Sequence, residues 1–269
     1  MNAISVGPLM LAADRAAALI GIFAFTLVAG MLARRVDPDI RRWSFWALVA
    51  GIVAARVGHV AIHWDSFKDE PLRAFAVWQG GFFWPFGLLV ALAAIPLFLR
   101  GAQARLAALA PVAAGLFIWN VADQLTSAVE PVALPDTRFQ ALSADPIKLT
   151  DSIGRPMIIN LWASWCPPCR REMPMLEAYS HEVRDVSFIF ANQGEDAGRV
   201  TAYLDKEGLD LPVALLDRLG ELGRHYNVPG LPATLFIDGD GMLSNVHLGE
   251  ISRESLDAKL GALKAQGVR

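Results

Sequence analysis

Cysteine is scarce in this sequence, which contains only two among 269 residues. Two cysteines cannot form the disulfide framework of a small secreted domain, and they supply at most half of the ligands of a structural zinc site. Charged residues make up only 19% of the chain, and the net charge of −3 argues against a general nucleic-acid-binding protein. Hydrophobic residues make up 54%, which excludes intrinsic disorder. At about 150 residues per domain, the length predicts two domains.

The charges are distributed unevenly along the chain. Residues 1–128 hold 17 charged side chains with a net charge of +3, whereas residues 129–269 hold 34 with a net charge of −6. The first half therefore has the low charge density of a membrane domain, and the second half resembles a soluble domain in this respect. We predict an all-α transmembrane domain over 1–128 and a separate soluble domain over 129–269.

Four apolar stretches in the first half are long enough to cross a bilayer, which takes about 20 predominantly apolar residues in a helix. They are residues 16–33, 43–64, 82–99 and 105–126. Arg34 and Arg35 follow the first stretch directly, where a signal peptide would carry its cleavage site, so we expect a retained span. The sequence thus predicts four transmembrane helices in contact with the lipid bilayer.

Basic residues in the loops predict the orientation, because cytoplasmic loops are enriched in Lys and Arg. The first loop holds four arginines, and the third holds two with no acidic residue. The second loop combines two basic with three acidic residues. Loops one and three are therefore expected in the cytoplasm, which predicts a multi-pass membrane protein with both termini on the periplasmic or extracytoplasmic side.

Polar side chains in the second span are costly in lipid and therefore need an explanation. Arg56, His59 and His63 are the residues concerned, and we expect structural or headgroup contacts for them rather than catalysis or transport.

The loop that follows the second span either lies flat at the outer interface or packs as an ordered loop on the helices. Its apolar residues at helical spacing are Leu72, Phe75, Ala76 and Trp78.

The stretches AARVGHVAIHW and VWQGGFFWPFGLL resemble the early spans of prolipoprotein diacylglyceryl transferase, the enzyme that lipidates lipoproteins. The resemblance covers about residues 10–116, and Arg56 corresponds to a family arginine. In that family a His-Gly-Gly motif that bears on catalysis follows the Gly-Gly pair. Here Pro85, Phe86 and Gly87 occupy those positions. The resemblance therefore implies shared ancestry and argues against transferase activity.

The second half alternates between strand and helix patterns, with a hairpin around the Gly239-Asp240-Gly241 turn. The expected strands are residues 157–162, 186–192 and 211–217, the expected helices are 166–182, 200–208 and 252–266, and the hairpin covers 233–249. Ser252 is the expected N-cap of the last helix. This order predicts an α/β sandwich.

Both cysteines lie in this half, as a Cys-Pro-Pro-Cys motif at a junction between strand and helix. The positive end of the helix dipole favours a thiolate at the first turn, so Cys166 can attack a partner disulfide and Cys169 can resolve the mixed disulfide. A zinc site is an alternative, but the histidines of this half show no paired spacing. A structural disulfide is another, although so short a loop adds little stability. We expect no metal and no cofactor beyond the cysteine pair.

The segments NLWASWCPPCRREMP and VPGLPATLFID resemble the thioredoxin superfamily, and within it the TlpA/ResA/CcmG-like periplasmic thiol–disulfide oxidoreductases. The resemblance covers about residues 136–266 and implies a thioredoxin fold. It also implies roles for residues besides the cysteines. Trp165 matches the family's tryptophan, and Pro232 matches the cis-proline that presents a backbone edge to the substrate. Glu172 matches an acidic residue near the pair, which implies that it handles the proton of Cys169.

Three further residues, and a second interpretation of Glu172, bear on this resemblance. Asn160 stands where cytosolic thioredoxins keep a buried aspartate, and Pro174 lies where the family kinks its active-site helix. Glu172 has an alternative interpretation as a solvated carboxylate on a helix face. Glu195 is similar to another family position, or it simply lies in the first turn of the next helix.

The resemblance implies a disulfide reductase that is anchored in the bacterial inner membrane, with both termini in the periplasm. It would serve exported proteins such as apocytochrome c or copper-centre proteins. The first 128 residues contain no cysteine, so we expect another membrane protein of the DsbD type to supply electrons. Two alternatives remain open. One is a non-catalytic membrane scaffold, and the other is a protein like lipoprotein diacylglyceryl transferase with an accessory thioredoxin domain.

Overall fold

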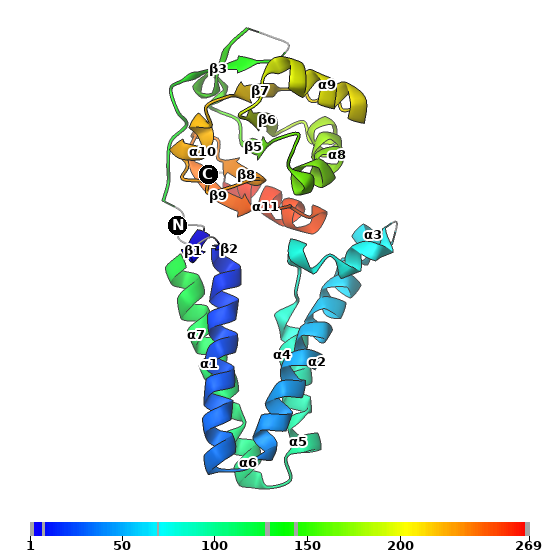
Figure 1. Cartoon of the computed structure of the whole chain (residues 1–269), viewed down its shortest axis with the longest axis vertical. Helices are drawn as coiled ribbons and strands as arrows, with labels where there is room; N and C mark the ends of the chain where they lie inside the picture. The colour runs from blue at the N-terminus through cyan, green and yellow to red at the C-terminus, as the bar shows by residue number, and fades with distance from the viewer. Residues whose placement is uncertain (1–2, 7–8, 69, 127–129, 143–144, 267–269) are drawn as a thin grey trace. The chain divides into compact units, whose positions relative to one another are not determined.

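The structure, a computed structural model, describes residues 3–6, 9–68, 70–126, 130–142 and 145–266. The chain divides into two compact units between residues 128 and 129. The first unit is helical apart from a small hairpin, and the second is built on a β-sheet (Figure 1).

The first unit contains long apolar helices joined by shorter ones. Its helices are α1 (Ala13–Arg35), α2 (Asp39–Ile62), α3 (Trp64–Phe67), α4 (Trp84–Ala93), α5 (Ile95–Phe98), α6 (Ala102–Ala107) and α7 (Leu109–Thr126). By length and composition, three helical stretches of the described chain could cross a membrane, namely 13–35, 39–62 and 102–126. Three of the four expected spans are thereby confirmed as apolar helices of sufficient length.

The remaining expected span, 82–99, is shorter than predicted. It forms an apolar helix over Trp84–Phe98 that is interrupted between α4 and α5. Pro96 lies in the first turn of α5, and because proline lacks a backbone N–H it cannot continue the hydrogen bonding of α4. The helix therefore falls short of the length that a straight transmembrane span requires.

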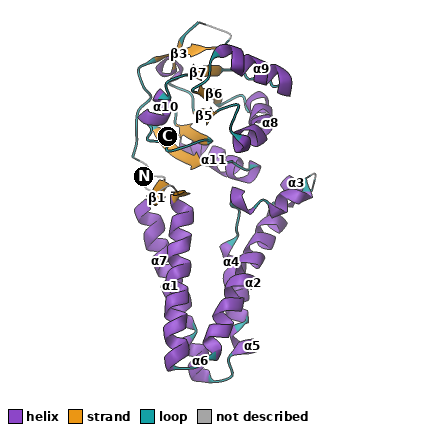
Figure 2. Cartoon of the chain, in the orientation of Figure 1, coloured by secondary structure: helices purple, strands orange, loops and turns teal. Residues whose placement is uncertain are grey.

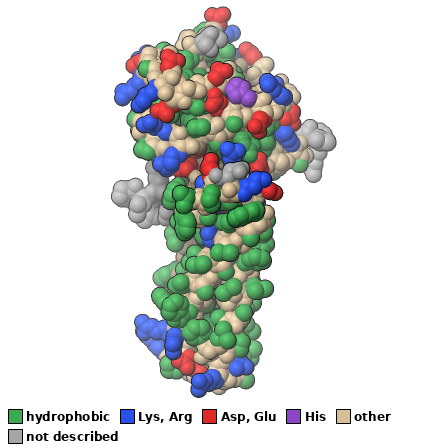
Figure 3. Space-filling model, turned by 90° about the vertical axis from the view of Figure 1, so that its right-hand side faces the viewer, with side chains coloured by type: hydrophobic (Ala, Val, Ile, Leu, Met, Phe, Trp, Pro, Cys, Tyr) green, Lys and Arg blue, Asp and Glu red, His purple; other side chains and the backbone are tan. Residues whose placement is uncertain are grey.

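Close helix contacts in this unit depend on glycine. A Cβ atom at Gly21 of α1 would lie 2.7 Å from the Cβ of Trp119 on α7, and one at Gly87 of α4 would lie 2.6 Å from the carbonyl oxygen of Gly51 on α2. Hydrophobic side chains cover the sides of these helices, and basic side chains gather at one end (Figure 3). The surface is thus apolar along the helices, as expected for contact with lipid.

Arg56 of α2 holds the loop that follows it. Its guanidinium donates hydrogen bonds of 2.7–2.9 Å to the backbone carbonyls of Arg73, Ala74, Gly80 and Gly81. The loop forms two 3-10 helices, Pro71–Phe75 and Val77–Gln79, rather than the regular helix that the spacing suggested. These contacts give Arg56 a structural role in ordering the loop.

The described part of the chain begins with a hairpin that the sequence did not predict, formed by β1 (Ala3–Val6) and β2 (Leu9–Ala12) (Figure 2).

The second unit is built on one sheet, in which the described residues form seven strands in the order β4-β3-β7-β6-β5-β8-β9. These strands are β3 (Arg138–Ala141), β4 (Ile147–Lys148), β5 (Met157–Trp162), β6 (Ser187–Gln193), β7 (Ala214–Asp217), β8 (Ala233–Ile237) and β9 (Leu243–Leu248). The strands β5, β6 and β7 are parallel, and β8 runs antiparallel to β5.

Helices cover both faces of this sheet, so β5 is buried along its whole length. They are α8 (Pro167–Glu182), α9 (Ala197–Glu207), α10 (Glu221–His225) and α11 (Arg253–Gln266). Side chains alternate between two apolar cores, with Ile158 and Trp162 in one and Ile159 in the other. The predicted α/β architecture is confirmed.

The boundaries of several elements differ from the predictions. Helix α9 begins earlier than expected, at Ala197, because the side chain of Asp196 caps it by accepting from the N–H of Arg199. Strand β7 is confined to Ala214–Asp217, and Pro212 precedes it without a backbone N–H for pairing. Ser252 caps α11 as predicted, because its Oγ accepts from the N–H of Ser255 at 3.3 Å.

Candidate active site

Cys166 and Cys169 form a disulfide with an S–S distance of 2.08 Å at the start of α8. Cys166 is the N-cap residue, and its Sγ accepts a hydrogen bond of 3.3 Å from the N–H of Cys169. Pro167 begins the helix, where the N–H that proline lacks would have no partner in the helix. Cys166 is 3% exposed and Cys169 is fully buried, so solvent reaches the pair through Cys166. The helix dipole and the Cys169 N–H would stabilise a thiolate at that sulfur.

Trp165 and Pro232 lie at the same end of the sheet as the disulfide. Trp165 is 63% exposed, which is unusual for an indole in a folded domain. The Leu231-Pro232 peptide bond is cis, and the next residue, Ala233, pairs with Leu161 near the end of β5. The carbonyl of Pro232 accepts from the N–H of Gly249 at 2.9 Å, which ties this segment to the end of β9.

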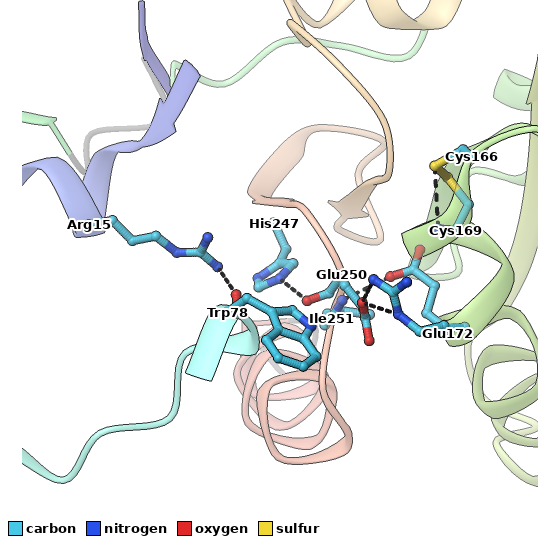
Figure 4. A network of polar contacts seen from close by, with 9 residues as sticks. Arg15, Trp78, Cys166, Cys169, Glu172, His247, Glu250 and Ile251 are labelled. Carbon is cyan, nitrogen blue, oxygen red and sulfur yellow. Dashed lines mark hydrogen bonds and ion pairs between the residues drawn. A yellow bond between two sulfur atoms is a disulfide. The ribbon is translucent and has the colours of Figure 1, made fainter. Parts of the chain in front are cut away.

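Glu172 lies one turn after Cys169 on α8 and is only 2% exposed, so it is not a solvated carboxylate on the helix face. One carboxyl oxygen accepts from the side-chain amide of Asn160 at 2.8 Å. The other accepts from the N–H of Ile251, also at 2.8 Å (Figure 4). Burial raises the pKa of Glu172 to about 8, although these two hydrogen bonds oppose the shift. The group can therefore hold or release a proton near neutral pH.

Asn160 of β5 can serve either protonation state of Glu172. Its Nδ2 donates to Glu172 and to Thr234 Oγ1, and its Oδ1 is a buried acceptor without a partner among the described residues. An amide can present either its NH2 group or its oxygen to the same space. In the second orientation, Oδ1 would accept the proton of a neutral Glu172 carboxyl group.

Glu195 holds the segment that precedes the disulfide. Its carboxylate accepts from the N–H and the hydroxyl of Ser164, at 2.7 and 2.6 Å, and from Asn192 at 2.8 Å. Burial alone would raise the pKa of Glu195, but these hydrogen bonds together with Arg199 hold it below its ordinary value. Glu195 precedes the N-cap residue of α9 and is therefore not in the first turn of that helix.

Sequence reasoning missed several partners of these residues. Ser164, Asn192, Thr234 and the N–H of Ile251 carry no motif that would identify them. Within the described residues, no group of three or more His, Cys, Asp and Glu side chains is arranged to hold a metal ion. The chemistry that this site itself supplies is that of a cysteine pair with a buried carboxyl group.

Comparison with protein families gives one match for each half of the chain. The Redoxin family model matches residues 130–260. The prolipoprotein diacylglyceryl transferase family model matches residues 2–122, a longer segment than the resemblance noted from the sequence.

The second half is also similar to individual proteins. It is 32% identical to the thioredoxin-like protein YneN of Bacillus subtilis over 130 residues, which cover 47% of this chain and 75% of YneN. It is 32% identical over 132 residues to the thiol-disulfide oxidoreductase ResA of Geobacillus kaustophilus, covering 48% of this chain and 75% of ResA. A crystal structure of a secreted Mycobacterium tuberculosis disulfide oxidoreductase shares 27% identity with a TM-score of 0.43, covering 48% of this chain and 96% of that one.

Proposed function

Because the chain belongs to the family of ResA-like thiol–disulfide oxidoreductases, we propose that it is a membrane-anchored reductase of disulfides in exported proteins. The cysteine motif implied a thioredoxin fold and oxidoreductase activity, and both agree with the family of its relatives. The first half is a membrane-associated helical unit. We propose in addition a direction of electron flow, a side of the membrane for the reaction and a class of substrate. Its main support is the Cys166–Cys169 disulfide beside the buried Glu172.

The proposed reaction begins with the reduced pair. The Cys166 thiolate attacks one sulfur of a substrate disulfide, which forms a mixed disulfide and releases the other substrate sulfur as a thiolate that takes a proton. Cys169 then loses its proton and attacks Cys166, which re-forms the protein disulfide seen here and releases the second substrate thiol. Two electrons pass from the enzyme to the substrate. Of the two protons that the substrate thiols gain, one originates from Cys169 and the other comes from the solvent, which took the Cys166 proton when the thiolate formed.

Glu172 is proposed as the group that takes the Cys169 proton in the second step. Its pKa of about 8 leaves a fraction of the carboxyl groups ionised at neutral pH, and a base with a pKa near the working pH is efficient. Asn160 would remain bonded to Glu172 before and after the transfer. This arrangement supports a proton route that avoids bulk water beside a fully buried cysteine.

Trp165 and Pro232 are proposed to bind the substrate chain beside Cys166. Trp165 offers an exposed apolar surface, and the cis segment before β8 offers backbone groups at the same end of the sheet. Exported proteins such as apocytochrome c or copper-centre proteins are the proposed substrates.

We propose a membrane domain over 1–128 and a periplasmic domain over 129–269, with both chain termini in the periplasm. Six arginines in the first and third loops support this orientation. Both cysteines of the sequence lie in the second half, so the membrane half cannot relay electrons by thiol exchange. A separate membrane donor of the DsbD type would therefore re-reduce the pair.

Trapping of a mixed disulfide tests the function directly. In the full chain with Cys169→Ala, the intermediate at Cys166 cannot be resolved, so substrate proteins are expected to remain covalently attached and can be identified after purification. The matched Cys166→Ser variant should capture none. Capture by neither variant would contradict the proposal.

A redox titration of the solubilised full chain tests the direction. A reductase is expected to have a midpoint potential below about −200 mV, in the range of thioredoxin and glutaredoxins. A value near about −120 mV, typical of the oxidant DsbA, would reverse the direction that we propose.

A further inference from the structure

The loop between β9 and α11 is attached to α8 at two consecutive residues. The carboxylate of Glu250 accepts from Nε and Nη2 of Arg171, at 2.8 and 2.6 Å, and the next residue, Ile251, donates its N–H to Glu172. The Glu250 side chain is only 6% exposed, whereas that of Arg171 is 51% exposed, so a partly exposed cation holds a buried carboxylate. Arg171 and Glu172 are neighbours in sequence, so two adjacent residues of α8 bind Glu250 and Ile251, respectively.

The peptide unit that joins Glu250 to Ile251 has a partner on each side. Its N–H donates to Glu172, and its carbonyl oxygen lies 3.3 Å from Nε2 of His247. A carbonyl can only accept a hydrogen bond, so Nε2 is the ring nitrogen that carries the proton in this contact. One peptide group therefore links the imidazole of β9 to the carboxyl group on α8 (Figure 4).

His247 also belongs to a row of polar residues across the sheet. It is paired with Thr234 of β8, which in turn is paired with Asn160 of β5, so the three side chains share one face of the sheet. Thr234 and Asn160 are hydrogen-bonded to each other, and Asn160 donates to Glu172. Glu172 is thus bonded on one side to the Asn160–Thr234 pair and on the other to the peptide group that contacts His247.

We propose that the Glu250–Ile251 peptide unit is the positioning element of Glu172, and that Arg171 and His247 hold this unit with its N–H facing the carboxyl group. The inference rests on the proposed function, because it concerns the carboxyl group that serves Cys169. Arg171, Glu250 and His247 are then positioning residues that act through Ile251 and do not touch the substrate.

The charges around Glu172 allow this role to be separated from simple electrostatics. Glu250 favours the neutral form of Glu172 and Arg171 favours the ionised form, while the Ile251 N–H also favours the ionised form. The other hydrogen-bond partner of Glu172, the side-chain amide of Asn160 on β5, carries no charge. Removal of the Glu250 charge alone should therefore lower the pH at which Glu172 titrates, whereas loss of the N–H should raise it.

The sign of the shift in Glu250→Ala is the test. Titration of Glu172 in the oxidised full chain can be followed by the carbon-13 chemical shift of its carboxyl group, assigned with Glu172→Gln. We expect the midpoint to move to higher pH by about one unit, which is the size expected for loss of one hydrogen bond to a charged group. A midpoint that stays in place or moves to lower pH would overturn the proposal.

A second pair of variants avoids any change in the charge of Glu250. His247→Leu removes the donor to the Glu250 carbonyl and should raise the titration midpoint of Glu172. His247→Gln keeps a donor, so its midpoint should lie close to that of the unsubstituted protein. The same midpoint in both variants would count against the proposal. Arg170→Ala is the matched control on α8, because Arg170 pairs with Glu207 of α9 at 3.0 Å and should leave the midpoint unchanged.

These outcomes are independent of the test of function. The titration uses the oxidised protein and requires no substrate, so thiol exchange can succeed while the positioning proposal fails. If mixed-disulfide trapping fails while the Glu172 midpoint moves as expected, the positioning element is real and the reductase function is not.

Discussion

The side-chain amide of Asn160 donates to the carboxyl group of Glu172 at 2.8 Å, and neither residue is more than 2% exposed. Buried carboxyl groups are rare unless they are paired with a charge or serve a function. Here the partners are a neutral amide and a backbone N–H rather than a direct ion pair. The carboxyl group can consequently change its protonation state without leaving a strong partner charge behind.

The stability of the oxidised protein should depend on pH through Glu172. The pKa of this group is about 8 in the folded protein and near 4.5 in its ordinary state, so the folded state binds the proton more tightly. The resulting stabilisation is complete below about pH 4.5 and is lost as the pH rises towards 8, with a slope of at most about 1.4 kcal/mol per pH unit. Glu172→Gln should remove this dependence, which thermal unfolding between pH 5 and about 8 can measure. If the free energy of unfolding had the same slope against pH in both proteins, this prediction would be wrong.

Glu172→Gln should also slow the resolving step selectively. The amide cannot take the Cys169 proton, and loss of a general base commonly costs a factor of about 100 or more. Rapid-mixing measurements on a model disulfide would separate formation of the mixed disulfide at Cys166 from its resolution. We expect the first rate to be nearly unchanged. Similar slowing of both steps would indicate a structural defect instead.

Glu195→Gln should loosen the segment that carries Trp165. The carboxylate receives two hydrogen bonds from Ser164, and replacement by an amide removes one acceptor and the charge that strengthens the rest. We expect a loss of about 1–3 kcal/mol in the free energy of unfolding and a higher KM for protein substrates. Arg199→Gln is the control, because its side chain is 66% exposed and its ion pair with Glu195 should contribute little.

The membrane orientation predicts where the cysteine pair can be labelled. After mild reduction of intact cells, a membrane-impermeant thiol reagent should modify Cys166, since the second half is expected in the periplasm. Cys166→Ser provides the background. Labelling that requires disruption of the inner membrane would place the domain in the cytoplasm and exclude the proposed reaction with exported proteins.

Local sequence features predicted much of this architecture. The buried strand over 157–162 and the helix that begins after Cys166 were evident because a continuous apolar run and a Cys-X-X-Cys motif depend on neighbouring residues. Apolar length likewise identified the helices of the first half. In the third apolar stretch, the apolar length predicted one helix over 82–99, but Pro96 interrupts the helical hydrogen bonding there. The predicted helix was therefore too long.

The environment of the site was decided by tertiary structure. Glu172 and Ile251 are 79 residues apart, and Glu195 and Ser164 are 31 apart. The amino-acid sequence by itself determined where a thiolate could be stabilised, because the helix start supplies its own N–H groups. Only the packing of α8 against β5 and the loop before α11 decided that Glu172 is buried, since burial and the resulting change in its pKa depend on atoms brought together from distant parts of the chain.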